Sequence, residues 1–275
     1  MTRYLANCSM LFTELPVLRR PAAAREAGFA AIEFWWPFAS PTPAGAEVEA
    51  FVAAVSDAGV HLVGLNLFAG DLAGPDCGVL SVPGRAAEFR DNVEVAVAIG
   101  ERLGVRAFNA LYGNRVDGTS PEAQDETAAE NLALAAAAAD RIGAGILIEA
   151  VSGPKPYPLR TADQAVAVVD AARAAGADNI GFLCDLYHLA TNGDDLAAVI
   201  ERHAPKITHV QIADAPGRGE PGSGRLDLAG HVAALREHGY EGWVSLEYRP
   251  TTTTEESLAW LPRERRAGTA PEEDK

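Results

Sequence analysis

Oxygen-bearing side chains mark four successive apolar runs in the second half of the chain. The runs Ile146–Glu149 and Gly181–Asp185 end in carboxylates, the next run carries Gln211, and Val244–Glu247 again ends in a carboxylate. A carboxylate that closes an apolar strand costs free energy to bury alone. Taken singly, each acid is explained as a helix cap or as half of a loop salt bridge. Because the pattern repeats at four successive runs, we expect these side chains to share a ligand.

A divalent cation is the simplest shared ligand. If the four runs are neighbouring strands, Glu149, Asp185, Gln211 and Glu247 converge at one rim and can offer only oxygen donors. All-oxygen ligation favours Mg²⁺ or Mn²⁺ over Zn²⁺. His209, two residues before Gln211, is expected on the same inward face but deeper in the fold.

The elements that must position these side chains alternate along the chain. Eight short β-branched or aromatic runs are separated by alanine-rich helical stretches, at roughly 34 residues per unit, a spacing typical of structural repeats. The predicted strands are Tyr4–Cys8, Ala30–Phe34, His61–Leu65, Ala107–Ala110, Gly145–Glu149, Ile180–Cys184, Ile207–Ile212 and Trp243–Glu247. Eight such alternations predict an α/β fold, a single (β/α)8 TIM barrel. A doubly wound sheet is the alternative, but the residues after the first strand lack the glycine-rich phosphate turn that it needs.

Five longer helices are predicted between the strands, and each is followed by a glycine. They are Ala46–Ala58, Arg85–Leu103, Pro121–Ile142, Thr161–Ala175 and Leu226–His238. Glycine takes the left-handed conformation with which a helix ends before a strand. We expect residues 1–261 to form one catalytic barrel domain that includes a short helix at Glu255–Leu261. Residues 262–275 are expected to be a disordered tail.

Composition and charge exclude several classes of protein. The chain has 38 acidic and 23 basic residues and a net charge of −15, which disfavours nucleic-acid binding. The sequence contains no run of 18 apolar residues, so no membrane-spanning helix is expected. The first residues do not resemble a signal peptide. Cys8, Cys77 and Cys184 are odd in number and form no CxxC pair. They are therefore expected to be free thiols of a cytoplasmic protein.

Further motifs are spread over most of the chain. They are Ala6–Phe12, Ile32–Phe34, Asn66–Arg85, Glu88–Asp91, Asp185–His188, Gln211–Asp214, Arg218–Gly224 and Leu246–Pro250. With this combination the chain resembles the hydroxypyruvate isomerase family, within the xylose-isomerase-like TIM barrels, over roughly residues 3–261. Each motif alone is weak, and their combination is specific to this family.

The resemblance implies a metal site and an acid–base pair. It assigns Glu149, Asp185, Gln211 and Glu247 to the metal ion, and Glu149 and Glu247 also to catalysis. The implied reaction interconverts hydroxypyruvate and 2-hydroxy-3-oxopropanoate, which is tartronate semialdehyde. The residue types suit this reaction, because a cation that binds both oxygens stabilises an enediolate while a carboxylate moves the proton between carbons. One glutamate can carry that proton, so the two need not contribute equally.

Several polar residues are candidates for substrate binding. His188 is expected to donate to a substrate oxygen, unless it caps the next helix or fills the rim. Arg218, in a glycine-rich loop, is expected to bind a substrate carboxylate, with a salt bridge to Glu220 or Asp214 as the alternative. Lys155 is a weaker candidate for the same task as Arg218.

Asn7 and Asn66 lie in two of the matching stretches and complete the expected substrate-binding set. One loop departs from the family pattern. The family often has Glu-Pro-Ile-Asn after the fifth strand, whereas here Glu149 is followed by Ala-Val-Ser-Gly-Pro-Lys. The whole loop, Ala150–Leu159, is therefore expected to influence substrate preference.

Other functions of the same fold stay open. A ketose 3-epimerase or a 2-oxo-tetronate isomerase would use the same site, and an inosose-type dehydratase would use a similar barrel and metal. A non-catalytic barrel would leave the four predicted ligands without a purpose. A DNA-repair endonuclease of the trinuclear zinc type needs several histidine ligands and a basic groove, which six scattered histidines and a net charge of −15 do not favour. The expected partners are a small-molecule acid and, through the apolar patch Trp35–Phe38, a second copy of the chain.

Overall fold

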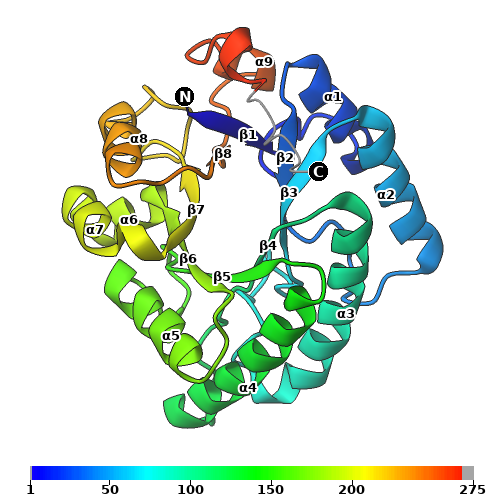
Figure 1. Ribbon diagram of the computed structural model, residues 1–275, viewed down its shortest axis with the longest axis vertical. Helices are drawn as coiled ribbons and strands as arrows, with labels where there is room; N and C mark the ends of the chain where they lie inside the picture. The colour runs from blue at the N-terminus through cyan, green and yellow to red at the C-terminus, as the bar shows by residue number, and fades with distance from the viewer. Residues whose placement is uncertain (1, 268–275) are drawn as a thin grey trace.

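Eight parallel strands close into one barrel in the order of the chain (Figure 1). The structure is a computed structural model that describes residues 2–267. The strands are β1 (Arg3–Asn7), β2 (Ala31–Phe34), β3 (His61–Asn66), β4 (Ala107–Asn109), β5 (Gly145–Glu149), β6 (Ile180–Asp185), β7 (Ile207–Ile212) and β8 (Trp243–Leu246). β8 closes the barrel against β1, with Trp243 opposite Arg3. The predicted (β/α)8 architecture is confirmed, and the strand ends differ from prediction by one residue at most.

Helices form the outer layer around the barrel (Figure 1). They are α1 (Arg20–Glu26), α2 (Gly45–Ala58), α3 (Ala86–Leu103), α4 (Pro121–Asp140), α5 (Ala162–Ala174), α6 (Leu186–Asn192), α7 (Leu196–His203), α8 (Leu228–Glu237) and α9 (Thr254–Ser257). Short 3₁₀ turns lie at Val17–Arg19, Pro83–Arg85, Ala204–Lys206 and Arg263–Arg265. The five predicted helices correspond to α2, α3, α4, α5 and α8, with ends shifted by at most two residues. The helices α1, α6 and α7 are too short for a helical period to stand out in the sequence.

Local capping explains where the predicted helices begin and end. The Ser120 hydroxyl accepts a hydrogen bond from the N–H of Ala123 at the start of α4, where proline occupies the first turn. Thr161 and Gln164 form a capping box at the start of α5. Gly59 ends α2 with a left-handed φ of 63°. These signals are local, so they can be read from the sequence.

The main core lies between the barrel and the helices. Phe34 of β2 packs edge to face on Phe51 of α2, with ring centroids 5.3 Å apart. Leu5, Ala31 and Trp243 form a separate small cluster, because alternate residues of a strand point to opposite faces of the barrel wall.

The chain after β8 returns to the start of the barrel. The helix α9 begins one residue before the predicted helix Glu255–Leu261 and is shorter. Beyond it, the Arg266 guanidinium donates to the carbonyl oxygen of Ala27, which fastens the segment 262–267 beside α1. The disorder expected from residue 262 stays a prediction. Residues 268–275 lie outside the described part of the chain.

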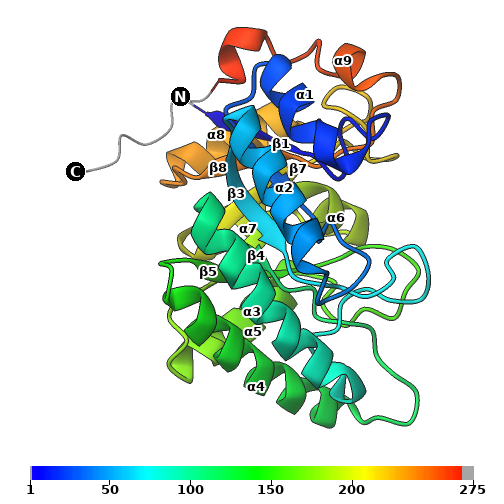
Figure 2. The ribbon, with the colours of Figure 1, turned by 90° about the vertical axis from the view of Figure 1, so that its right-hand side faces the viewer.

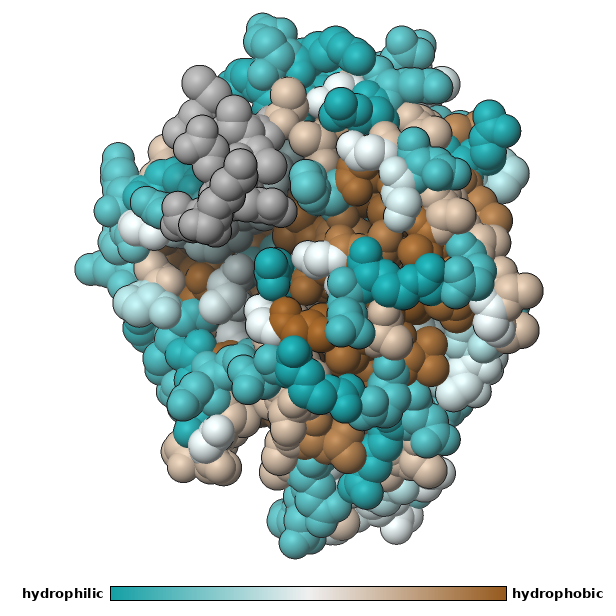
Figure 3. All heavy atoms as spheres, turned by 45° about the vertical axis from the view of Figure 1, so that its right-hand side comes forward, coloured by the Kyte–Doolittle hydropathy of each residue, from teal (hydrophilic) through white to brown (hydrophobic). Residues whose placement is uncertain are grey.

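The loops that follow the strands gather at one end of the barrel. Figure 2 shows the long connections after β3 and β4 projecting together on its right-hand side. These loops stand over the carboxyl ends of the strands, which is where barrel enzymes place their sites. The face in Figure 3 carries many hydrophilic side chains around its edge, with hydrophobic residues showing toward its centre. Within residues 2–267, no helix combines the length and the apolar character that crossing a membrane requires.

Candidate active site

Each of the eight strands contributes one buried polar side chain at or next to its carboxyl end. These are Asn7, Glu33, Asn66, Asn109, Glu149, Asp185, Gln211 and Glu247, and none is more than 8% exposed. We call this set the polar ring. Because the parallel strands of a barrel end at the same face, the polar ring surrounds one mouth of the barrel. It contains all four residues predicted to bind a metal ion.

The four predicted metal ligands form two close groups. Glu149 and Asp185 each place an oxygen 3.7 Å from Nε2 of His188. Ligand atoms of these three residues lie within 4.8 Å of one another. Gln211, opposite Asp185 in the register of β6 and β7, donates from Nε2 to Oε2 of Glu247. Strand ends that are far apart in the sequence are thus brought to one place.

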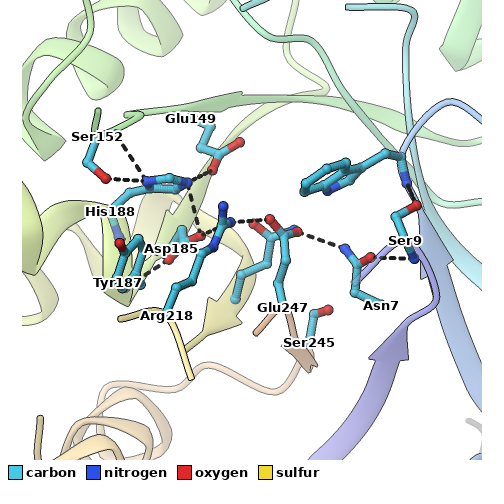
Figure 4. A network of polar contacts seen from close by, with 12 residues as sticks. Asn7, Ser9, Glu149, Ser152, Asp185, Tyr187, His188, Arg218, Ser245 and Glu247 are labelled. Carbon is cyan, nitrogen blue, oxygen red and sulfur yellow. Dashed lines mark hydrogen bonds and ion pairs between the residues drawn. The ribbon is translucent and has the colours of Figure 1, made fainter. Parts of the chain in front are cut away.

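Arg218 joins the two groups (Figure 4). Its Nη2 lies 2.5 Å from Oε1 of Glu247 and 3.5 Å from Oδ2 of Asp185. The residue adopts a left-handed φ of 61°, which is uncommon without glycine and is a form of backbone strain seen at functional sites. The alternative of a salt bridge to Glu220 or Asp214 is wrong, because within residues 2–267 both ion pairs of Arg218 are with the polar ring.

Two observations indicate that the residues fit a divalent cation. Oδ2 of Asp185 and Oε1 of Gln211 are buried and have no hydrogen-bond partner within residues 2–267. Leaving such oxygens unsatisfied costs free energy, which ligation of a cation would offset. The donor set of three carboxylates and one amide oxygen is also the type that Mg²⁺ and Mn²⁺ prefer. Both features match the predicted metal site.

The pKa values of the three buried carboxylates Glu149, Asp185 and Glu247 are raised. Burial, reinforced by the negative charge of Asp185, raises the pKa of Glu149 to about 8. Burial raises the pKa of Asp185 to about 6, although Arg218 acts in the opposite direction. Burial also raises the pKa of Glu247 well above its usual range, again against the effect of Arg218. A nearby cation would favour the ionised form of all three groups.

Hydrogen bonds place the proton of His188. The backbone N–H of Ser152 donates to Nδ1 of His188 at 3.0 Å, and the Ser152 hydroxyl lies 2.7 Å from the same nitrogen. A backbone amide can only donate, so Nδ1 accepts, and in the neutral ring Nε2 carries the hydrogen. Burial, together with the positive charge of Arg218, holds the pKa of His188 well below its ordinary value. A neutral ring with Nε2–H is a hydrogen-bond donor and has no lone pair there for a metal ion.

The two asparagines predicted to bind substrate both belong to the polar ring. Nδ2 of Asn7 donates to Glu33 and to Glu247, at 2.8 Å in each case. Asn66 lines a cavity of about 500 Å³ that continues under the loop after β3. Trp35 lines the same cavity. Asn7 is therefore committed to neighbouring side chains, whereas Asn66 faces open space.

Lys155, the weaker candidate for the substrate carboxylate, lies between two loops beside the site. Its Nζ donates to the carbonyl oxygens of Leu72 and Asp76, at 2.9 and 2.6 Å. Lys155 thus connects the loop after β5 to the loop after β3. The structure gives it the task of joining two loops beside the site, and it makes no ion pair with the polar ring among the described residues.

Three residues of the site were not candidates in the sequence. Glu33 accepts hydrogen bonds from ring neighbours, and Asn109 donates to Oε2 of Glu149 at 2.8 Å. Glu33 and Asn109 stand at or next to strand ends. The pattern that identified the three carboxylates and the amide of the predicted metal site would therefore also have identified them. Ser152 holds His188 from the loop that departs from the family pattern, and only the fold of that loop reveals the contact.

Glu33 and His209 form a buried pair below Gln211. Nε2 of His209 lies 2.7 Å from Oε2 of Glu33. Burial alone would raise the pKa of Glu33, but His209, followed by hydrogen bonds from Ser245 and Gln211, holds it below its usual range. The predicted place of His209, deeper than Gln211 on the same face, is confirmed.

Comparisons with known proteins show the family to which the chain belongs. The family model described as xylose isomerase-like TIM barrel matches residues 21–264. A provisionally named hydroxypyruvate isomerase of Streptomyces coelicolor is 54% identical, over 96% of this chain and 97% of its own length. The hydroxypyruvate isomerase of Escherichia coli is 34% identical, over 95% and 98% of the two chains. The chain belongs to the hydroxypyruvate isomerase family.

Relatives in and around the hydroxypyruvate isomerase family carry several names. A 2-oxo-tetronate isomerase of Cupriavidus necator is 33% identical, over 95% of this chain and 98% of its own. A crystal structure described as an AP endonuclease of family 2 from Brucella melitensis superimposes with a TM-score of 0.85 at 33% identity, covering 94% and 98% of the two chains. One fold thus serves proteins with different names, so the chemistry must be argued from the site.

Proposed function

We propose that this protein is an isomerase that interconverts hydroxypyruvate and 2-hydroxy-3-oxopropanoate. The observation that carries the proposal is the position of two buried carboxylates, Glu149 and Glu247. They stand on the strands that flank Asp185 and Gln211, each of which has one buried oxygen without a hydrogen-bond partner among the described residues. Acid–base groups therefore lie beside a place for a cation. The names of the relatives in Streptomyces coelicolor and Escherichia coli support the same activity.

In this proposal, Glu149, Asp185, Gln211 and Glu247 hold Mg²⁺ or Mn²⁺. The bound ion supplies Lewis-acid polarisation of the carbonyl and hydroxyl oxygens of the substrate. Arg218 then carries only part of the positive charge that the three carboxylates require, which leaves its guanidinium able to serve a second anion.

Glu149 and Glu247 transfer the proton. One carboxylate removes a proton from C3 of hydroxypyruvate, the carbon that bears the hydroxyl group, and the electron pair of that C–H bond forms the C2=C3 bond of an enediolate. Return of a proton to C2 leaves the aldehyde at C3. A second proton must pass from the oxygen on C3 to the oxygen on C2. The glutamate that does not take the carbon-bound proton accepts this second proton and returns it. The Nε2–H of His188 points toward Glu149 and Asp185, donates a hydrogen bond to a substrate oxygen and keeps its proton.

Arg218 binds the carboxylate of the substrate. Its Nε is buried and has no hydrogen-bond partner in the described part of the chain, so the guanidinium keeps unused donor capacity. A planar fork of donors matches a carboxylate in geometry. The loop is shaped around Asp214, whose carboxylate accepts from the backbone N–H groups of Gly222 and Leu226. Asn66 orients the remaining oxygens of the substrate. Asn7 supports the site by holding Glu33 and Glu247, and Lys155 holds the surrounding loops.

A second candidate substrate is the four-carbon acid 2-oxo-tetronate. The cavity at Asn66 extends beyond the polar ring and is lined by Trp35, Trp36 and Phe68, which gives room for a further carbon. The relative in Cupriavidus necator carries the name of that activity. A neutral ketose would make no use of Arg218, which disfavours a 3-epimerase. The name of the Brucella structure is not transferred, because a net charge of −15 disfavours a nucleic-acid substrate.

A substrate panel tests this proposal. Protein loaded with Mg²⁺ or Mn²⁺ is incubated with hydroxypyruvate, 2-oxo-tetronate and a neutral ketose, and the products are followed by NMR in H₂O and in D₂O. We expect hydroxypyruvate to be converted to the aldehyde with the highest kcat/KM, and Glu149→Gln to serve as the control for uncatalysed enolisation. Preference for 2-oxo-tetronate would select the second candidate. Turnover of the neutral ketose alone would replace the proposal with an epimerase.

The setting of the enzyme is part of the proposal. Cys8, Cys77 and Cys184 are free and buried, which supports a reducing, cytoplasmic location. Association into a homo-oligomer is also proposed. Trp36 and Phe38 are only partly buried, with their ring centroids 5.1 Å apart, and they offer an apolar contact for a second copy.

A further inference from the structure

We infer that Glu33 is a positioning residue that fixes the side-chain amide of Gln211 with its oxygen toward the cation site. The inference rests on the proposed function, because the ion that Gln211 would hold belongs to that proposal. Glu33 itself is not a candidate ligand. It stands next to the end of β2, on the side of Gln211 away from the oxygen without a partner.

The hydrogen bonds of Gln211 decide which way its amide faces. Nε2 of Gln211 donates to Oε1 of Glu33 at 2.9 Å and also donates to Oε2 of Glu247. An ionised carboxylate can only accept, so Glu33 requires the NH₂ group on its side. An amide rotated by half a turn would place its oxygen against two carboxylates. Oε1 of Gln211 therefore points away from Glu33, where it has no partner within residues 2–267.

Glu33 is itself held by three further side chains. Nδ2 of Asn7 donates to its Oε1 at 2.8 Å, and the Ser245 hydroxyl donates to the same oxygen at 2.5 Å. Nε2 of His209 lies 2.7 Å from the other oxygen. These contacts come from β1, β8 and β7, so the carboxylate is fixed from several strands at once. A buried acceptor with this many donors cannot rotate without breaking several hydrogen bonds.

A glycine makes room for the Glu33 carboxylate. Gly64 pairs with Glu33 in the register of β2 and β3. A Cβ atom at Gly64 would lie 3.2 Å from Oε2 of Glu33, which is tighter than ordinary van der Waals contact. A side chain at this position would therefore require the Glu33 carboxylate to shift by a few tenths of an ångström.

The consequence concerns the donor atoms of the proposed cation site. With the amide fixed by Glu33, Gln211 presents oxygen and the site consists of oxygen donors. Residues that orient metal ligands in this way affect affinity by about 10- to 100-fold. The competing explanation is that Glu33 adds negative charge near the ion without acting through Gln211. The two explanations differ in whether the effect of Glu33 requires the amide of Gln211.

A double-mutant cycle on Mn²⁺ binding separates them. The dissociation constant of Mn²⁺ is measured by electron paramagnetic resonance of the free ion for the wild-type protein, Glu33→Gln, Gln211→Ala and the double variant. We expect Glu33→Gln to weaken binding about 10-fold, the lower end of the usual range, because a neutral amide at position 33 accepts either orientation of Gln211 while Glu247 still accepts from its Nε2. In the Gln211→Ala background, the same change should alter binding by less than about threefold.

A second variant keeps all charges in place. Gly64→Ala adds the Cβ that displaces Glu33, and it should weaken Mn²⁺ binding only when Gln211 is present. The melting curve of metal-free Glu33→Gln shows whether that variant folds. If it does not fold, Gly64→Ala is used in its place. Ser245→Ala, which removes a different donor from the same oxygen, should cost less than Glu33→Gln.

Three results would overturn the inference. Equal losses with and without the Gln211 amide would assign Glu33 a role through its charge alone. Unchanged Mn²⁺ affinity in Glu33→Gln and Gly64→Ala, with normal binding by the wild-type protein, would remove Glu33 while leaving the proposed function intact. No Mn²⁺ binding by the wild-type protein would overturn both the inference and the proposed metal site.

Discussion

Ser152 holds Nδ1 of His188 with its backbone N–H at 3.0 Å and its hydroxyl at 2.7 Å, and these contacts turn Nε2–H of the imidazole toward Glu149 and Asp185. The hydrogen lies where a substrate oxygen beside the proposed cation would need a donor. Ser152 belongs to the loop after β5 that departs from the family pattern. That loop therefore contributes to the site through the main chain, which tolerates a change of side chain.

The tautomer of His188 is open to direct observation. In protein labelled with ¹⁵N-histidine, NMR should show Nδ1 of His188 as the unprotonated nitrogen and Nε2 as the protonated one. Because burial holds the pKa of this ring well below its ordinary value, the signals should not titrate between pH 6 and 8. Ser152→Ala keeps the backbone N–H and should keep the tautomer. A ring that titrates near pH 6.5, or that is protonated at Nδ1, would refute the assignment.

The two glutamates should affect turnover more than affinity. Glu149→Gln and Glu247→Gln each remove a group able to accept the proton, and positioned acid–base groups contribute about 10²- to 10⁴-fold to rate. We expect kcat to fall by that range for at least one variant, measured at matched metal occupancy because both residues are also proposed ligands. Near wild-type turnover in a fully metal-loaded variant would show that the glutamate in question is not an essential base.

Arg218 should discriminate between charged and neutral substrates. A charge-assisted hydrogen bond contributes about 1.5–3 kcal/mol, so Arg218→Ala should raise KM for hydroxypyruvate roughly 10- to 100-fold. Arg218→Lys should recover only part of this loss, because an ammonium group cannot form the paired contact. Steady-state kinetics with a neutral ketose provide the control. Equal damage to both substrates would assign Arg218 to the structure of its loop.

The raised pKa of Glu149 predicts how stability depends on pH without metal. Since the pKa is raised to about 8 in the folded protein, the neutral form is favoured there, and this stabilisation is lost as the pH rises toward and through 8. In the presence of a chelator, Glu149→Gln cannot ionise, so its melting temperature should rise relative to wild type between pH 6 and 9. Glu94→Gln, at an exposed ion pair with Arg141, is the matched control. A difference that shrinks with rising pH would contradict the assignment.

The sequence was sufficient to predict the barrel and much of the site. Strand ends and helix ends are marked by local signals such as Gly59 and the Ser120 cap, so the elements were predictable to within one or two residues. The placement of Glu149 and Glu247 followed, because parallel strands bring their carboxyl ends to one mouth. The short helices were not predictable, because seven or eight residues give no clear helical period.

The pairing of side chains across the barrel was harder to predict from the sequence. Arg218 pairs with Glu247, which lies 29 residues away in the sequence, and this depends on the path of a loop that closes over the mouth. Lys155 joins two loops, because its long side chain reaches carbonyl groups that only the fold brings near, and the sequence does not reveal these contacts. Such contacts depend on tertiary structure and leave no periodic signal in the sequence.

The most direct test of the central claim is a Mn²⁺ titration of metal-free protein, with bound metal and turnover of hydroxypyruvate measured in the same samples. If Glu149, Asp185, Gln211 and Glu247 hold one catalytic ion, binding should saturate at one Mn²⁺ per chain, and turnover should rise in proportion to occupancy. Mg²⁺ should also restore activity after chelation. Turnover that survives exhaustive chelation, or that is unrelated to the amount of bound metal, would contradict the account.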